Sequence, residues 1–307
     1  MDIKQSGIKK FDNITKYLPN RVAIELLRLS DEIKLSANEI RIRCQKPIVV
    51  MMPESYIFPD KDHVLTQNDI SEIFQKLCEY SVYSYQTELS QGFITLPGGH
   101  RVGICGTASL DKNGNRTVKY ISSINIRIAS EYIGCARELV NKIFPENICG
   151  TLIVGPPCCG KTTILRDIAL NFSSESRMKK VVIVDERGEI AAIYRGIPQN
   201  TVGLFCDVLN GYPKGEGILI ALRTLSPDVI ICDEIGSEED AKALCEGVNA
   251  GVAVISSVHA CNAEELYTRN SCKRLLETGA FKKIVFLKGG KYRGMVENII
   301  EVQEKLC

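Results

Sequence analysis

The stretch TLIVGPPCCGKTTILRDIAL, residues 151–170, decides the fold of this 307-residue chain. Its first four residues, TLIV, predict a buried strand, and TTILRDIAL predicts a helix. The loop between them has the spacing G-x-x-x-x-G-K-[ST], with Gly155, Gly160, Lys161 and Thr162 in the defining positions. In a strand–loop–helix setting this spacing is typical of a loop that binds the phosphates of a nucleoside triphosphate.

Each residue type in the loop suits that task. Successive backbone N–H groups and the helix N-terminus attract phosphate, and Lys161 adds a full positive charge beside the β and γ phosphates. The Thr162 hydroxyl is a candidate ligand of Mg²⁺. The expected cofactors are therefore ATP and Mg²⁺. The residues expected to bind the nucleotide are Gly155, Pro156, Pro157, Cys158, Cys159, Gly160, Lys161, Thr162 and Thr163.

The chain has 13 cysteines, which show neither CxxC pairs nor a zinc-ligand spacing. We interpret most of them as reduced thiols that pack as small apolar side chains. Cys158 and Cys159 fit the variable positions of the phosphate loop because they are small. An alternative is redox inhibition, since the pKa of a thiol falls at a helix N-terminus.

Downstream, the strands VVIVDE, VIICDE and VAVISSVHA are almost wholly apolar and alternate with helical stretches. This pattern predicts a mainly parallel sheet covered by helices on both faces, in a P-loop domain over residues 135–307. The carboxyl ends of such strands meet at one edge of the sheet. That edge gathers Glu186, Asp233, Glu234 and His259. Asp233 is a candidate Mg²⁺ ligand, and either Glu234 or Glu186 is the candidate general base.

Residues 1–134 follow a different pattern, which predicts an α+β domain with a helical lead-in broken at Pro19. Polar and apolar residues alternate from Glu39 to Arg43, and DISEIFQKLCEYSVYSY (Asp69–Tyr85) has helical spacing. GFITLPGGHRVGICGTASL predicts two strands joined by a turn at residues 97–99, DKNGN (111–115) predicts a hairpin tip, and INIRIAS predicts another strand. The terminal FKKIVFLKGGKYRGMVENIIEV predicts a strand hairpin whose basic turn is a candidate docking segment.

The composition narrows the class of partner. The net charge is +1, so no basic stripe indicates nucleic acid, and a DNA-translocating motor is disfavoured. No apolar run reaches the roughly 18 residues that a membrane span requires, and the N-terminus lacks the apolar core of a signal peptide. We therefore expect a cytoplasmic protein without a transmembrane segment of its own.

The order of these motifs resembles the secretion and pilus ATPase superfamily, which includes type II and type IV secretion motors of the VirB type and pilus retraction motors. GPPCCGKTT matches its Walker A loop, VVIVDERGEIA its Asp box, LRTLSPDVIICDEIG its Walker B and AGVAVISSVHACNAEEL its His box. The resemblance implies a RecA-like domain. The chain departs from the superfamily at Asp233, where glycine is usual, and at Cys261, which places Asn262 one residue late.

The N-terminal half resembles one family within it, the stage III sporulation AA proteins of endospore-forming bacteria. NEIRIRCQKP, LSQGFITLPGGHRVGICGTA and SSINIRIAS carry this resemblance. In the wider superfamily the N-terminal domain directs two arginines to the γ-phosphate. The matching positions in this chain are Arg101 and Arg127, and the resemblance implies that both are catalytic. The other expected catalytic residues are Lys161, His259 and the general base, which is either Glu234 or Glu186.

The resemblance implies an ATPase that works as a hexameric ring. Its expected partners are membrane channel proteins of the sporulation apparatus, and its expected place is the inner face of a membrane on the mother-cell side. Two alternatives from other classes stay open at this point. One is a P-loop small-molecule kinase, and the other is a nucleotide-gated scaffold of low turnover.

Overall fold

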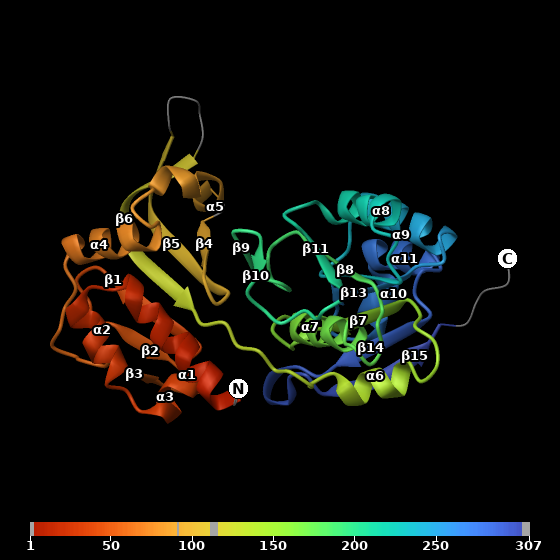
Figure 1. The fold of residues 1–307 in the computed structure, drawn as a ribbon, viewed down its shortest axis with the longest axis horizontal. Helices are drawn as coiled ribbons and strands as arrows, with labels where there is room; N and C mark the ends of the chain where they lie inside the picture. The colour runs from red at the N-terminus through yellow and green to blue at the C-terminus, as the bar shows by residue number, and fades with distance from the viewer. Residues whose placement is uncertain (1–2, 91, 111–115, 303–307) are drawn as a thin grey trace. The chain divides into compact units, whose positions relative to one another are not determined.

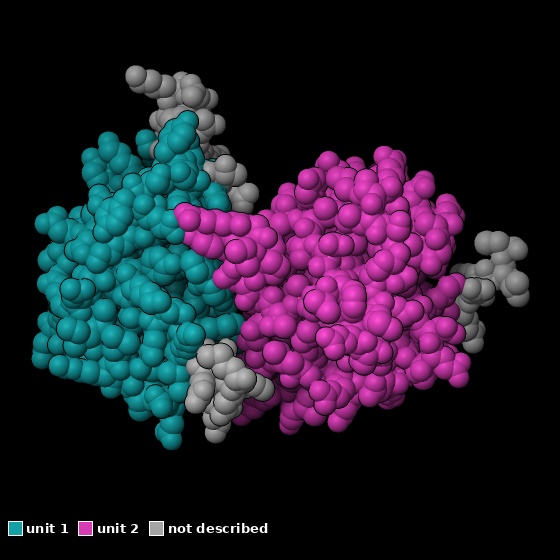
Figure 2. Space-filling view, in the orientation of Figure 1, with its two compact units in different colours: residues 1–130 teal, residues 131–307 magenta. Residues whose placement is uncertain are grey.

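Two strand patterns in the sequence produce the two large sheets of the computed structural model, which describes residues 3–90, 92–110 and 116–302. The chain divides into unit 1, residues 1–130, and unit 2, residues 131–307 (Figure 2). The sequence pattern predicts a boundary between residues 134 and 135. Residues 131–134 lie with unit 2 because the Gly134 N–H donates to the Asp167 carboxylate at 2.7 Å.

Unit 1 is an α+β fold. Its helices are α1 (Ile3–Ile14), α2 (Asn20–Leu27), α3 (Asp31–Ser36), α4 (Gln67–Leu77) and α5 (Gln86–Ser90), with 3₁₀ turns η1 (Thr15–Tyr17) and η2 (Val82–Tyr85). Its strands are β1 (Glu39–Arg43), β2 (Val49–Met51), β3 (Tyr56–Ile57), β4 (Phe93–Leu96), β5 (His100–Leu110) and β6 (Arg116–Arg127). The strands pair in the order β3-β2-β1-β6-β5-β4, each pair antiparallel.

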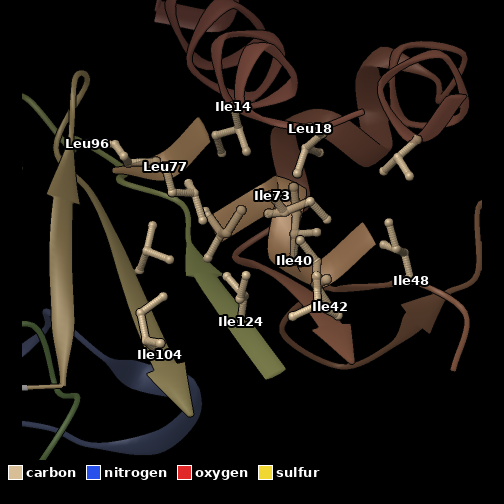
Figure 3. Close-up of a cluster of buried hydrophobic side chains, with 14 of the residues drawn as sticks. Ile14, Leu18, Ile40, Ile42, Ile48, Ile73, Leu77, Leu96, Ile104 and Ile124 are labelled. Atoms are coloured by element: carbon tan, nitrogen blue, oxygen red, sulfur yellow. The ribbon is translucent and has the colours of Figure 1, made fainter. Parts of the chain in front are cut away.

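Buried and more exposed side chains alternate along these strands, so the sheet has one buried face and one open face. Ile40, Ile42, Ile104 and Ile124 point to the buried face, where α1 and α4 cover them with side chains such as Ile14 (Figure 3). The residues that alternate with the buried ones lie on the opposite face. They include Arg101, which precedes the buried Val102, and Arg127, which follows the buried Ile126. This face is the one that carries the arginines predicted to act on a nucleotide.

Three local predictions in unit 1 have different outcomes. The turn between the strands of residues 93–110 is confirmed, since the Gly99 N–H donates to the Leu96 carbonyl at 3.0 Å. The predicted helix from Asp69 to Tyr85 is too long, because α4 ends at Leu77. Glu79 and Tyr80 follow in left-handed conformations, with φ of 49° and 59°, and these stop the helix. The predicted hairpin tip at residues 111–115 lies outside the described residues.

The strands of unit 2 are β7 (Thr151–Gly155), β8 (Val181–Asp185), β9 (Ile193–Tyr194), β10 (Ile197–Pro198), β11 (Cys206–Asn210), β12 (Val229–Cys232), β13 (Ala253–His259), β14 (Lys283–Leu287) and β15 (Val296–Glu301). Its helices are α6 (Arg137–Ile143), α7 (Lys161–Phe172), α8 (Lys214–Thr224), α9 (Glu238–Asn249), α10 (Ala263–Thr268) and α11 (Asn270–Glu277), with a 3₁₀ turn η3 (Gly290–Tyr292). The main sheet has the order β11-β8-β12-β13-β7-β14-β15.

The sheet of unit 2 is parallel from β11 to β14, and β15 returns antiparallel. Helices cover both faces, as Figure 1 shows. Ile153 and Ile183 pack toward α6 and α7, whereas Val154 and Val184 pack toward α8 and α9. Burial on both faces explains why these strands read as continuous apolar runs, and the predicted fold class is confirmed.

Candidate functional site

The phosphate loop, residues 155–160, connects β7 to α7 and turns too tightly for ordinary side chains. A Cβ on Gly155 would lie 2.6 Å from the Cys159 sulfur, so glycine is required there. Gly160 caps α7 with φ of 101°, a conformation that glycine adopts without strain. Cys158 is exposed and also has a positive φ, of 60°. Cys159 is buried, and this burial raises the pKa of its thiol, which keeps it protonated.

Lys161, the first residue of α7, is buried, with 4% of its surface exposed. Its Nζ donates to the carbonyl oxygens of Gly155 and Pro156 at 3.0 Å each. It also lies 2.8 Å from Nδ1 of His259, at the end of β13. Because an ammonium only donates, Nδ1 is the acceptor and the imidazole proton resides on Nε2.

Glu234 continues this chain of contacts. Its Oε1 lies 2.6 Å from His259 Nε2, and its Oε2 accepts from Arg187 Nη1 at 3.1 Å. The residue follows β12 in a left-handed conformation with φ of 49°, which is uncommon for a side chain of this kind. Its N–H donates to the Ser257 hydroxyl at 3.1 Å. A hydrogen-bonded chain therefore links Lys161, His259, Glu234 and Arg187.

Asp233 lies beside the start of α7. One carboxylate oxygen accepts from the Thr162 hydroxyl and the other from the Ser257 hydroxyl. Parallel pairing of β12 with β13 places Cys232 opposite Ser256, and so it brings Asp233 next to Ser257. The pair of Thr162 and Asp233 provides a hydroxyl and a carboxylate in contact with each other.

This donor set fits Mg²⁺. Among the residues that the structure describes, no group of three or more His, Cys, Asp and Glu side chains is arranged to hold a metal ion. Mg²⁺ bound with a nucleotide commonly takes only one or two protein ligands and completes its shell with phosphate oxygens and water. Thr162 and Asp233 therefore meet that requirement, whereas a closed structural metal centre would need more ligands.

The acids after β8 have separate surroundings. Asp185 is buried, and its carboxylate accepts from the backbone N–H groups of Glu189, Ile190 and Ala191 at 2.8–3.2 Å. Burial raises the pKa of Asp185, and these N–H donors oppose the increase. The carboxylate thus holds the loop that follows β8. Glu186 instead forms an ion pair with Lys214 at the start of α8.

The acidic groups of the site line one hollow at the carboxyl edge of the sheet. Its walls are Val184, Asp185, Glu186, Arg187, Glu189, Lys214, Asp233 and Glu234. Thr163, at the next position of α7, lines a second hollow with residues that include Arg166 and Asp167. Hydrogen bonds connect Lys161, His259 and Glu234, and the neighbouring Asp233 bonds Thr162, so these five predicted residues lie together. Glu186 lies nearby with a different partner.

The remaining two predicted residues belong to unit 1. Arg101 on β5 and Arg127 on β6 are paired across neighbouring strands, on the open face of the sheet. The Arg101 guanidinium carbon lies 3.7 Å from the centre of the Phe93 ring, which is a cation–π contact. Gly103 is the residue paired with Phe93, so no side chain competes with the ring on that side.

Sequence reasoning missed Arg187, Lys214, Ser257 and Phe93. Arg187 carried a signal, because it follows Glu186 in the same acidic loop. Ser257 also carried one, since it lies two residues before His259 on a strand that ends at the site. Nothing in the sequence indicated a role for Lys214 or Phe93, because their contacts with Glu186 and Arg101 depend on the tertiary fold.

Comparisons with known proteins identify the family and the fold of the chain. A family model described as "Sporulation stage III, protein AA" matches residues 8–306. The chain is 38% identical over 293 residues to stage III sporulation protein AA of Bacillus subtilis (strain 168), which covers 94% of this chain and 95% of that relative.

Two solved structures are similar in fold. The ATPase DotB of Legionella pneumophila has a TM-score of 0.57 and 18% sequence identity to this chain. The match covers 83% of this chain and 73% of the DotB chain. The pilus retraction motor PilT with bound ADP has a TM-score of 0.58 and 14% identity, covering 83% and 75%. At these identities the likeness shows the fold alone, that of secretion-type ATPases. No helix within the described part of the chain has the length and apolar character of a membrane span.

Proposed function

Because the chain belongs to the sporulation stage III, protein AA family, we propose that it is an ATP-hydrolysing motor of the secretion type. Its work is to power or gate a membrane channel between mother cell and forespore. The observation that carries the proposal is the convergence of Lys161, Thr162, Asp233, Glu234 and His259 on the phosphate loop of unit 2. The two units are, in this proposal, the two domains of the motor.

The phosphate loop binds the nucleotide in this mechanism. The backbone N–H groups of residues 155–160 and the N-terminus of α7 attract the phosphates. Lys161 exchanges its carbonyl partners for β- and γ-phosphate oxygens. Thr162 and Asp233 are the residues that would hold Mg²⁺. Mg²⁺, when bound, neutralises the negative charge that develops on the phosphate oxygens.

Glu234 orients the attacking water and accepts its proton. It follows directly after Asp233, it is linked through His259 to Lys161, and its backbone conformation is held by Ser257. Glu186 is less suited to this role. Each carboxylate has a cationic partner, Lys214 for Glu186 and Arg187 for Glu234, but only Glu234 is also linked through His259 to Lys161. His259 bonds both Lys161 and Glu234, so it responds when Lys161 turns toward a γ-phosphate.

Arg101 and Arg127 neutralise the γ-phosphate as charge develops in the transition state. Because hydrolysis removes the group that they contact, nucleotide state changes the preferred arrangement of the two units. A homo-oligomeric ring, a hexamer in our proposal, turns these changes into work. The ring acts from the cytoplasm, at the inner face of a membrane on the mother-cell side, on channel proteins of the sporulation apparatus and without nucleic acid.

A product assay tests the reaction itself. With ATP and Mg²⁺, phosphorus NMR is expected to show ADP and inorganic phosphate in equal amounts, with further phosphorylated products absent. Formation of a phosphorylated small molecule would assign the chain to the kinases. Tight ATP binding with less than one turnover in a single-turnover experiment would make it a nucleotide-gated scaffold.

Arg127→Ala is expected to slow ATP hydrolysis about 10- to 100-fold, because one of the two arginines that neutralise the developing charge on the γ-phosphate is lost. ADP affinity should change less than about twofold, since ADP lacks that phosphate. Arg43→Ala is the matched control, because Arg43 lies on the same sheet face, opposite Ser123. Steady-state hydrolysis and ADP titration give the two numbers. Equal losses in both would show that Arg127 does not sense the γ-phosphate.

A further inference from the structure

The turn between β14 and β15 lies along the phosphate loop. We call residues 288–295, KGGKYRGM, the basic loop. A Cβ on Gly155 would meet the Leu287 carbonyl oxygen at 3.2 Å, and a Cβ on Gly289 would meet Pro156 Cγ at 2.8 Å. At the other end, the Gly294 N–H donates to the Cys159 carbonyl at 2.7 Å. The two loops therefore run side by side from Gly155 to Gly160.

The basic loop is fixed in this position. β14 pairs with β7, the strand that precedes the phosphate loop, and with β15 (Figure 1). The Lys288 N–H donates to the Met295 carbonyl at 2.9 Å and closes the loop at its base. Gly290 and Gly294 have φ of 63° and 81°, so the path between these bonds depends on glycine. The loop is thus anchored at both ends, once to its own hairpin and once to the phosphate loop.

The charged side chains of the basic loop are all positive. It contains Lys288, Lys291 and Arg293 and has no acidic residue. All three side chains are exposed, and none forms an ion pair within the part of the chain that the structure describes. The Lys288 ammonium lies 5.7 Å from the centre of the Tyr292 ring. Three cations beside a loop built for phosphate favour an anionic ligand at this place.

Arg293 is the best placed of the three. It immediately precedes Gly294, whose N–H bonds the Cys159 carbonyl. That carbonyl belongs to the same peptide group as the Gly160 N–H, one of the donors at the N-terminus of α7. The backbone of Arg293 is therefore one residue from a direct contact with the phosphate loop, and a guanidinium forms paired hydrogen bonds with phosphate oxygens.

We propose that the basic loop completes the nucleotide site, with Arg293 binding the phosphates of ATP and ADP. The proposal deepens the function given above and rests on it, because it requires that the phosphate loop bind a nucleotide. Lys291 adds charge at the same place. The ligand class is a nucleoside di- or triphosphate, recognised through its phosphate chain and not through its base.

The test measures binding of fluorescent ADP, and its displacement by tripolyphosphate, which has neither base nor ribose. Arg293→Ala is expected to weaken both ligands about tenfold, the loss of one charge-assisted hydrogen bond. Arg293→Lys should recover part of this affinity. Arg223→Ala, which removes an exposed arginine of α8, is the matched control and should change neither value more than about twofold.

Three outcomes would overturn the proposal. Unchanged affinity for both ligands in Arg293→Ala would show that the basic loop does not touch the phosphates. Loss of ADP binding with unchanged tripolyphosphate binding would place Arg293 on the nucleoside. A lower melting temperature without nucleotide, and the same loss in Arg293→Lys as in Arg293→Ala, would show a structural role.

Failure of the proposed function would look different. In that case the unmodified chain would bind neither ADP nor tripolyphosphate, and Lys161→Ala would change nothing. If the unmodified chain binds both ligands and Lys161→Ala loses them, while Arg293→Ala keeps them, only the inference about the basic loop is wrong.

Discussion

Lys161→Ala is expected to lower ATP hydrolysis by at least about 10³-fold, which is loss of measurable activity in an ordinary assay. The ammonium lies within the phosphate loop, on the first residue of α7, and a shorter side chain cannot supply its charge to the β and γ phosphates. Phosphate release over hours, compared with the unmodified chain at saturating ATP, gives the ratio. In the cell, the same variant should block sporulation if the motor proposal holds.

Loss of folding must be separated from loss of chemistry in this experiment. Without Lys161, the carbonyls of Gly155 and Pro156 and Nδ1 of His259 each lose a hydrogen-bond donor. We expect the free energy of unfolding to fall by about 1–3 kcal/mol, which leaves a folded domain. Lys179→Ala, at an exposed lysine of unit 2, is the control for charge. Hydrolysis within tenfold of normal in Lys161→Ala would end the proposal of an ATPase at this loop.

The sequence predicted unit 2 better than unit 1 for a physical reason. Parallel strands covered on both faces are apolar almost throughout. In VVIVDE and VIICDE the apolar run therefore predicts the strand, and the acidic pair after it predicts where the strand ends. The length of α4 was harder to predict. The helical spacing of Ile70, Ile73 and Leu77 continues beyond the end of the helix. The helix is stopped by Glu79 and Tyr80, which adopt left-handed conformations, and neither is a glycine, the residue type from which such a conformation is predicted.

The site was predicted as a set of residues but not as a network. Spacing along the chain indicates which side chains reach the carboxyl edge, whereas the contacts there depend on strand order. β12 lies between β8 and β13, and this brings Arg187 to one side of Glu234 and His259 to the other. The basic loop shows the same limit, because its sequence suggested a docking surface while its backbone bonds the phosphate loop.

Glu234→Gln and Glu186→Gln, compared in one assay, are expected to identify the general base. Glutamine keeps the shape of glutamate but accepts protons poorly, so Glu234→Gln should lower the rate constant of a single turnover about 10²- to 10⁴-fold. ATP affinity should stay within a few-fold, because the phosphate loop and Lys161 are unchanged. Glu186→Gln should cost less than about tenfold, since it weakens only the ion pair with Lys214.

The two variants control for each other, because each removes one carboxylate from the same hollow. A larger loss in Glu186→Gln would assign the base to the acid after β8 and leave Glu234 as a positioning residue between His259 and Arg187. Equal losses would contradict a single base. The expected difference follows from the surroundings of the two acids. Both have a cationic partner, but only Glu234 adjoins the residue that contacts Thr162 and connects through His259 to Lys161.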